Sequence, residues 1–179
     1  MLNLSKKNYK KIGILGGTFD PPHVGHLHIA KTGIKKLKLN KLIWIITKKN
    51  NLKKKPYLDL KTRIKLSKTI TKDEKKIFVQ YFENRIRSNN SFNLLKYIKN
   101  KNKRTKLYFL IGADNLVRLH KWNSWKKIPK LAKIVVFARQ NYSVKALNSI
   151  AAKKINKKDW IYINLKKINI SSSLIRKFW

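Results

Sequence analysis

Two histidines three residues apart lie in a short segment rich in glycine and proline. Residues 16–26 have the sequence GGTFDPPHVGH, in which His23 and His26 carry the imidazoles. At the start of a helix, residues with this separation lie on one face. Each imidazole offers an N–H donor to oxygen, and the first backbone amides of a helix attract anions. The segment therefore predicts a site for a polyphosphate.

Other interpretations of this segment fit less well. The dinucleotide-binding fingerprint needs Gly-x-Gly-x-x-Gly, and a Walker loop needs Gly-Lys followed by Ser or Thr. A zinc site could use both histidines, but the chain has no Cys, and no third ligand is evident nearby. An ordinary glycine turn remains as the alternative. In either case we expect Gly16 and Gly17 to form a sharp turn, and to let the backbone approach a ligand closely.

Alternating strands and helices must position this segment. Apolar runs predict buried strands at residues 11–15, 42–46, 77–82, 107–111, 134–138 and 160–163. Apolar residues at helical spacing predict helices at 25–39, 59–70 and 92–100, the last with Ser91 as its N-cap. This alternation predicts an α/β fold: a single Rossmann-like, doubly wound domain over residues 1–179, with a mainly parallel sheet of five to six strands. We expect residues 1–10 to be a flexible lead-in.

The composition limits the class of protein. The absence of Cys excludes a disulfide framework and thiolate chemistry. The apolar runs are far shorter than the ~20 residues that cross a bilayer, and the N-terminus lacks the apolar run of a signal peptide. We therefore expect a cytoplasmic protein with no membrane partner.

The formal net charge of +38 at pH 7 is the strongest feature of the composition. Such a balance is typical of proteins that bind nucleic acid. Here the lysines are spread along the whole chain beside many Ile and Asn, which favours a biased coding composition over a dedicated binding face. We do not expect nucleic acid as a partner. A nucleic-acid-binding protein stays as the alternative class, and it predicts strongly salt-dependent binding.

Two further segments carry groups that could bind a nucleotide. Gly112 and Asp114 follow the run 107–111, and ligand sites of α/β sheets lie at such strand ends. Asp114 could accept from ribose hydroxyls or cap the next helix, and the residues alone favour neither. Residues 170–177, ISSSLIRK, could form a phosphate clamp from hydroxyls, amides and Arg176, or an ordinary helix cap.

These segments together resemble a known family. Residues 16–26 are similar to the signature of nucleotidyltransferases that carry His-x-Gly-His, in the form found in bacterial nicotinate-nucleotide adenylyltransferases. Residues 170–176 resemble the second signature of that family, Ile-Ser-Ser-Thr-x-Ile-Arg, and residues 111–116 resemble its adenosine-side motif. The chain departs from the family at residues 89–91, which are Asn-Asn-Ser where Ser-Tyr-Thr is usual, and at 139–141, which are Arg-Gln-Asn where Arg-Pro-Gly is usual.

The resemblance implies an enzyme of NAD biosynthesis, which transfers AMP from ATP to nicotinate mononucleotide and gives nicotinate adenine dinucleotide and pyrophosphate. It implies Mg²⁺ bound with ATP and no metal held by the protein itself. It assigns catalysis to His23, His26 and Arg176. It assigns ATP binding to Gly16, Gly17, Thr18, Phe19, Gly112, Asp114, Ser172 and Ser173. It assigns binding of the mononucleotide to Lys53, Ser91, Trp122 and Arg139.

Two other acceptors fit the same chemistry: nicotinamide mononucleotide and phosphopantetheine. The region of Trp122 and Ser91 argues against phosphopantetheine, and the abundant lysines mildly favour the acid over the amide. The choice between acid and amide stays open at this point. A homo-oligomer is compatible with the sequence.

Overall fold

Six parallel strands form one sheet within the residues that the computed structural model describes, which are 11–50, 52, 54–139, 142–165 and 170–178. The strand order is β3-β2-β1-β4-β5-β6, and every neighbouring pair is parallel. The bounds are Lys11–Gly17 for β1, Lys41–Ile46 for β2, Ile77–Gln80 for β3, Lys106–Gly112 for β4, Lys133–Phe137 for β5 and Trp160–Ile163 for β6. The predicted α/β fold with a parallel sheet is confirmed.

The strand order reverses between β1 and β4, which lie next to each other in the middle of the sheet. Strands β2 and β3 continue the sheet beyond β1, and strands β5 and β6 continue it beyond β4. Helices that leave neighbouring strands at such a point go to opposite faces of the sheet. A crevice therefore opens at the carboxyl ends of the strands, where open α/β sheets bind their ligands.

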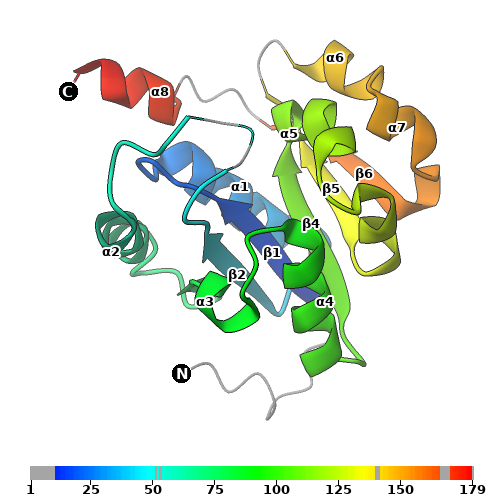
Figure 1. The fold of residues 1–179 in the computed structure, drawn as a ribbon, viewed down its shortest axis with the longest axis horizontal. Helices are drawn as coiled ribbons and strands as arrows, with labels where there is room; N and C mark the ends of the chain where they lie inside the picture. The colour runs from blue at the N-terminus through cyan, green and yellow to red at the C-terminus, as the bar shows by residue number, and fades with distance from the viewer. Residues whose placement is uncertain (1–10, 51, 53, 140–141, 166–169, 179) are drawn as a thin grey trace.

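Helices cover both faces of the sheet and give three layers (Figure 1). One core cluster joins the sheet to α4, α5, α6 and α7, with bounds Ser91–Lys101, Ala113–Arg118, Ser143–Leu147 and Ile150–Lys154. The second core cluster joins the other face to α1, Val24–Leu37, and α2, Leu60–Ile70. Short elements complete the described chain: α3 at Glu83–Ile86, α8 at Ser172–Ile175, and the 3-10 turns Leu119–Lys121, Trp125–Lys130, Lys157–Asp159 and Arg176–Phe178.

Side chains alternate between these two clusters along each central strand. On β2, Ile43 and Ile45 belong to the cluster with α4, whereas Leu42, Trp44 and Ile46 belong to the cluster with α1. All six residues of β2 are buried. The continuous apolar run that predicted this strand is thus explained by a sheet that is covered on both sides.

The expected sharp turn at Gly16 and Gly17 is wrong. Strand β1 continues through both glycines, which pair in register with Ile45 and Ile46 of β2. Among the described residues no glycine has a positive φ, and the left-handed residue of this segment is Phe19, with φ 50°. The chain leaves the sheet at Thr18 because β2 ends opposite Gly17.

Two predicted helix details also differ from the structure. Asn90, not Ser91, is the N-cap of α4, since its Oδ1 accepts from the Asn93 amide at 2.8 Å. Helix α1 ends at Leu37, two residues earlier than expected, because Lys38 adopts the left-handed conformation and its amide bonds back to the last turn. Residues 1–10, expected as a lead-in, lie outside the described residues.

No helix in the described ranges is both long enough and apolar enough to cross a membrane.

Candidate active site

A cleft of about 1930 Å³ lies across the carboxyl ends of the strands. Single small-molecule pockets occupy about 300–1,000 Å³, so this cleft has room for more than one ligand. Its walls come from the segments after β1, β2, β4 and β5, from α3, and from α8. The site residues predicted from the sequence that fall in the described chain all line it, namely Gly16, Gly17, Thr18, Phe19, His23, His26, Ser91, Gly112, Asp114, Trp122, Arg139, Ser172, Ser173 and Arg176. Lys53 lies outside the described residues.

His23 and His26 form a reciprocal cap at the start of α1. The Nδ1 atom of His23 accepts from the Gly25 amide at 3.2 Å, and the Nδ1 atom of His26 accepts from the His23 amide at 3.3 Å. The ring centroids are 3.8 Å apart. An Nδ1 that accepts a hydrogen bond has no proton, so each neutral ring carries its proton on Nε2. The cap thereby fixes both rings as Nε2–H donors.

Buried aromatic rings hold His26 in place. Phe19 stacks on Trp44 of β2 at 4.4 Å, and the edge of His26 meets Phe19 at 4.9 Å and Trp44 at 6.1 Å. Phe19 and Trp44 are almost fully buried. The backbone of Phe19 is left-handed at this position, with φ 50°. The side chain of Phe19 therefore supports His26 as well as lining the cleft.

Burial and the positive charge of Arg139 both lower the pKa of His23, from its ordinary 6.5 to about 4. In the unfolded chain the pKa returns to its ordinary value. Between these two values the unfolded state binds a proton that the folded state does not, so the free energy of unfolding falls as the pH falls. The contribution of His23 to stability is therefore complete above about pH 6.5 and declines toward pH 4.

We expect the variant His23→Asn to lose this part of the pH dependence. Asparagine keeps a side-chain oxygen for the cap but has no titrating group. Urea unfolding of wild type and variant at pH 7 and pH 5 measures the effect, and the wild type should lose more stability between the two pH values. An equal loss in both proteins would contradict the assignment of this dependence to His23.

Gly25 leaves the space that the His23 ring occupies. A Cβ at this position would lie 2.9 Å from Nδ1 of His23 and 3.3 Å from Ile170. We expect Gly25→Ala to displace the imidazole with little change in thermal stability. On the catalytic role that the family resemblance implies for His23, kcat should fall about tenfold, since small misplacements of catalytic groups are costly. Lys36→Ala, an exposed change on the same helix, is the matched control. A wild-type kcat in Gly25→Ala would show that the ring position does not limit turnover.

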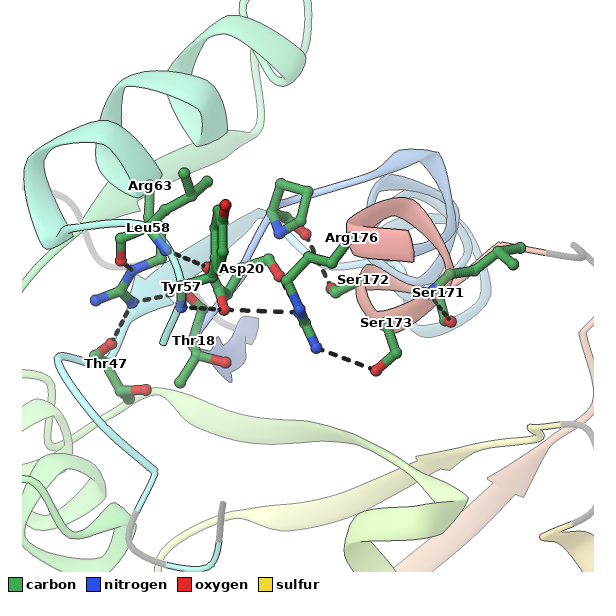
Figure 2. Close-up of polar contacts among 12 residues, drawn as sticks. Thr18, Asp20, Thr47, Tyr57, Leu58, Arg63, Ser171, Ser172, Ser173 and Arg176 are labelled. Atoms are coloured by element: carbon green, nitrogen blue, oxygen red, sulfur yellow. Dashed lines mark hydrogen bonds and ion pairs between the residues drawn. The ribbon is translucent and has the colours of Figure 1, made fainter. Parts of the chain in front are cut away.

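Helix α8 docks on the loop that precedes the histidines (Figure 2). Ser172 Oγ donates to the carbonyl of Pro21 at 2.9 Å, and Arg176 donates to the carbonyl of Asp20 and to Ser173 Oγ. The guanidinium also lies 3.6 Å from the Asp20 carboxylate. Residues more than 150 positions apart in the chain thus form one wall of the cleft. Segments 16–26 and 170–177, which the sequence singled out separately, therefore meet in one site.

Asp114 neither caps α5 nor stands alone. The N-cap of α5 is Gly112, and the carboxylate of Asp114 pairs with Arg139 at 2.8 Å. A Cβ at Gly112 would lie 2.6 Å from Asp114 Oδ1, so glycine is needed for the carboxylate to fold back. The ion pair joins the ends of β4 and β5. Its guanidinium, that of Arg139, carries the positive charge that helps to lower the pKa of His23.

Ser91 and Trp122 line the other half of the cleft. Trp122 follows the 3-10 turn Leu119–Lys121 and packs its ring edge against Phe109 of β4, with centroids 6.2 Å apart. Ser91 is the first residue of α4. Both line the same cleft as the segment after β2 and are remote in sequence from it.

Sequence reasoning missed the roles of two buried polar residues, Asp20 in the cleft lining and Arg63 outside it. Asp20 accepts from the amides of Tyr57 at 2.8 Å and Leu58 at 2.9 Å. Arg63 on α2 is 2% exposed and donates to backbone carbonyls of three segments. An arginine flanked by apolar helix positions was the one signal available in the sequence, because such a residue is rarely buried without partners.

The carboxylates of the cleft are engaged by the protein. Asp20 binds backbone amides and Arg176, Asp114 binds Arg139, and Glu83 accepts from the Lys48 amide at 2.9 Å. Within the described ranges, no group of three or more His, Cys, Asp or Glu is placed to hold a metal ion. A divalent cation in this cleft would therefore depend on oxygen ligands brought by a phosphate substrate.

Comparison with known proteins identifies the class of protein to which this fold and cleft belong. The sequence profile of the cytidylyltransferase-like family matches residues 14–178. A nicotinic acid mononucleotide adenylyltransferase of Plasmodium falciparum, solved as a complex with NaAD, shares the fold with a TM-score of 0.74. The match covers 94% of this chain and 83% of that one at 21% identity.

Closer relatives narrow the class. A protein of Pelagibacter ubique named probable nicotinate-nucleotide adenylyltransferase is 47% identical over 175 residues, which are 98% of this chain and 96% of that protein. A Clostridium novyi protein of the same name is 38% identical, over 93% of this chain and 86% of its own length. The chain therefore belongs to the cytidylyltransferase-like family, in its nicotinate-nucleotide adenylyltransferase branch.

Proposed function

We propose that the chain acts as a single catalytic domain that transfers AMP from ATP to nicotinate mononucleotide, forming nicotinate adenine dinucleotide and pyrophosphate. The observation that carries the proposal is the junction of α8 with the loop before the histidines, through Ser172 and Pro21 and through Arg176 and Asp20. This junction brings an arginine, a serine-rich helix start and two imidazole donors to one end of the cleft. Such a set of cationic and N–H groups suits a triphosphate.

The reaction is an in-line displacement at phosphorus. An oxygen of the mononucleotide phosphate attacks the α-phosphorus of ATP, and the bond to the oxygen that bridges the α- and β-phosphates breaks as pyrophosphate leaves. Such a step needs alignment and charge neutralisation, with little covalent help from the protein. A chain with no Cys is compatible with it.

The histidines supply the neutralisation. With each Nδ1 engaged by a backbone amide, the Nε2–H of His23 and His26 donates to the α-phosphate and to the departing pyrophosphate. Fixed donors of this kind stabilise charge as it develops, at no cost of reorganisation. The lowered pKa of His23 keeps this donor neutral at pH 7, with its proton on the same nitrogen.

Residues of β1, β4 and α8 hold ATP in this proposal. A Cβ at Gly16 would meet no protein atom within 4 Å, so packing does not require glycine here. The missing side chain instead leaves room in the cleft for a ligand. Gly16, Gly17, Thr18 and Phe19 lie along the phosphates, Gly112 and Asp114 lie at the ribose, and Ser172, Ser173 and Arg176 hold the outer phosphates. Mg²⁺ arrives as the complex with ATP and is ligated by phosphate oxygens and water.

The half of the cleft with Ser91 and Trp122 holds the mononucleotide in this proposal. The Trp122 ring stacks on the pyridine, Ser91 donates to its carboxylate, and Arg139 faces the acceptor phosphate beside His23. We assign Lys53 to the same substrate on sequence grounds. Cationic side chains at the cleft, including Lys49, Lys54 and Lys55, favour an acceptor with the extra negative charge of the acid.

Pyrophosphate release from ATP and Mg²⁺ tests the proposal, with nicotinate mononucleotide, nicotinamide mononucleotide and phosphopantetheine supplied in parallel. We expect release with the acid form and a dinucleotide product that chromatography identifies. Release with the amide form alone would keep the transfer and replace the acceptor. No release with any acceptor from a folded protein would overturn the proposal.

A further inference from the structure

Arg63 connects three separate backbone segments beneath the cleft. Its Nε donates to the carbonyl of Leu58 at 3.0 Å, and its Nη1 donates to the carbonyls of Thr18 and Thr47, each at 2.7 Å. Its Nη2 donates to the carbonyl of Lys48 at 3.0 Å. Four hydrogen bonds from one buried guanidinium therefore end on main-chain oxygens, as Figure 2 shows for Leu58, Thr18 and Thr47.

Three of these carbonyls belong to the segments that follow β1 and β2, and the fourth belongs to the segment before α2. Thr18 is in the segment that follows β1 and leads to the histidines. Thr47 and Lys48 follow β2 and begin the segment that contains Lys53, which the proposed function assigns to the acceptor. Leu58 precedes α2, on which Arg63 itself lies.

Two carboxylates bind backbone amides of the same segments whose carbonyls Arg63 binds. Asp20 accepts the amides of Tyr57 and Leu58, so the segment before α2 is tied to the loop after β1 a second time. Glu83 of α3 accepts the Lys48 amide at 2.9 Å, so Lys48 is held at its carbonyl by Arg63 and at its amide by Glu83.

We infer that Arg63 is a positioning residue that fixes the phosphate-side segment at Thr18 against the acceptor-side segment at Thr47 and Lys48. It lines no part of the cleft and acts through the backbone. The inference rests on the proposed function, because the two halves are named for their substrates. In-line attack needs the acceptor phosphate and the α-phosphate in one line, so the distance between these segments bears directly on turnover.

Lysine cannot replace this residue. Four carbonyls from three directions match the planar fork of a guanidinium, whereas an ammonium is a point donor with three N–H groups. Arg63→Lys keeps the charge and loses the geometry. Carbonyls left without a donor at a buried site are costly, so the segments would relax apart.

Steady-state kinetics with ATP and the mononucleotide varied separately test the inference. We expect Arg63→Lys to raise both KM values about tenfold and to lower kcat, because both substrates meet a displaced segment. The control is Ile98→Val, a buried core change on α4 that lowers stability at a residue outside the cleft lining. A loss of folded protein lowers the maximal rate and leaves both KM values unchanged, so unchanged KM values in Arg63→Lys would overturn the inference.

Amide hydrogen exchange on the same proteins gives a readout that needs no turnover. The Tyr57 and Leu58 amides should exchange faster in Arg63→Lys and at the wild-type rate in Ile98→Val at matched stability. Wild-type exchange in Arg63→Lys would overturn the inference. A wild type that releases no pyrophosphate overturns the proposed function alone, since the exchange result stands by itself.

A second variant covers the case in which Arg63→Lys fails to fold. Glu83→Ala releases the Lys48 amide while the Arg63 bond to Thr18 stays in place. We expect its KM for the mononucleotide to rise and its KM for ATP to stay at the wild-type value. Unchanged KM values for both substrates, or a rise for ATP alone, would overturn the inference.

Discussion

Replacement of His23 by asparagine is expected to lower kcat about 100- to 1,000-fold, the usual loss when one preorganised donor to a developing charge is removed. The cap of α1 should survive, because the side-chain oxygen of asparagine accepts a helix-start amide as well as any residue does. The wild-type imidazole uses Nδ1 for this cap and Nε2–H for the proposed donation. The substitution therefore removes the N–H at the Nε2 position, which the shorter asparagine amide does not reach, and keeps the cap.

Comparison with His23→Ala separates the two roles. Alanine removes both the donor and the cap, so it should show the same loss of kcat with an added loss of about 0.5–2 kcal/mol in the free energy of unfolding. Pyrophosphate release and urea unfolding are measured on both variants. Near wild-type kcat in His23→Asn would remove His23 from the catalytic assignment and leave it as a cap.

Replacement of Arg176 by alanine is expected to lower kcat/KM for ATP about 100-fold, since a charged clamp on a phosphate stabilises both the bound substrate and its transition state. The same guanidinium ties α8 to the Asp20 carbonyl and carboxylate. The substitution removes these contacts between α8 and Asp20. It also removes a positive charge from the part of the cleft that we propose binds the ATP phosphates. The KM for the mononucleotide should change little, because that half of the cleft does not contact α8 in the proposal.

Lys177→Ala is the matched control for this variant. Lys177 is the next residue, is exposed and carries the same charge, so its removal alters the net charge equally without touching Asp20. Initial rates at low ionic strength, with ATP varied, compare the two proteins. Equal losses in both would show that net charge near the cleft, and not the docked arginine, accounts for the effect.

Much of the fold and of the site followed from local sequence. The strands were predictable because apolar runs such as Leu42 to Ile46 are buried on both faces, and α1 was predictable because its apolar residues recur at helical spacing. The two segments that we propose bind phosphate were recognisable from residue types and separation in short stretches. His23 and His26 lie on one helix turn, and Arg176 lies just after three serines. Each of these features depends on neighbours within a few residues.

The errors came from distant partners. Gly16 and Gly17 suggested a turn, but the pairing of β1 with Ile45 and Ile46 extends the strand through both glycines. Asp114 does not cap α5, which was one of its two local roles, and it pairs instead with Arg139, 25 positions away in the chain. Pairing across a sheet and ion pairs between strand ends are set by topology, and a glycine or a carboxylate carries no local sign of them.

The sequence by itself determined that this chain has an α/β fold and belongs to a nucleotidyltransferase family, and it singled out the two segments that we propose bind phosphate. The tertiary structure alone decided that those segments meet through hydrogen bonds from Ser172 and Arg176 to the loop before the histidines, and that Asp20 and Arg63 tie this loop to the backbone before α2. The physical reason lies in their partners. Asp20 and Arg63 bind mainly backbone amides and carbonyls, which every residue type provides, so no pattern of side chains could reveal where those bonds would end.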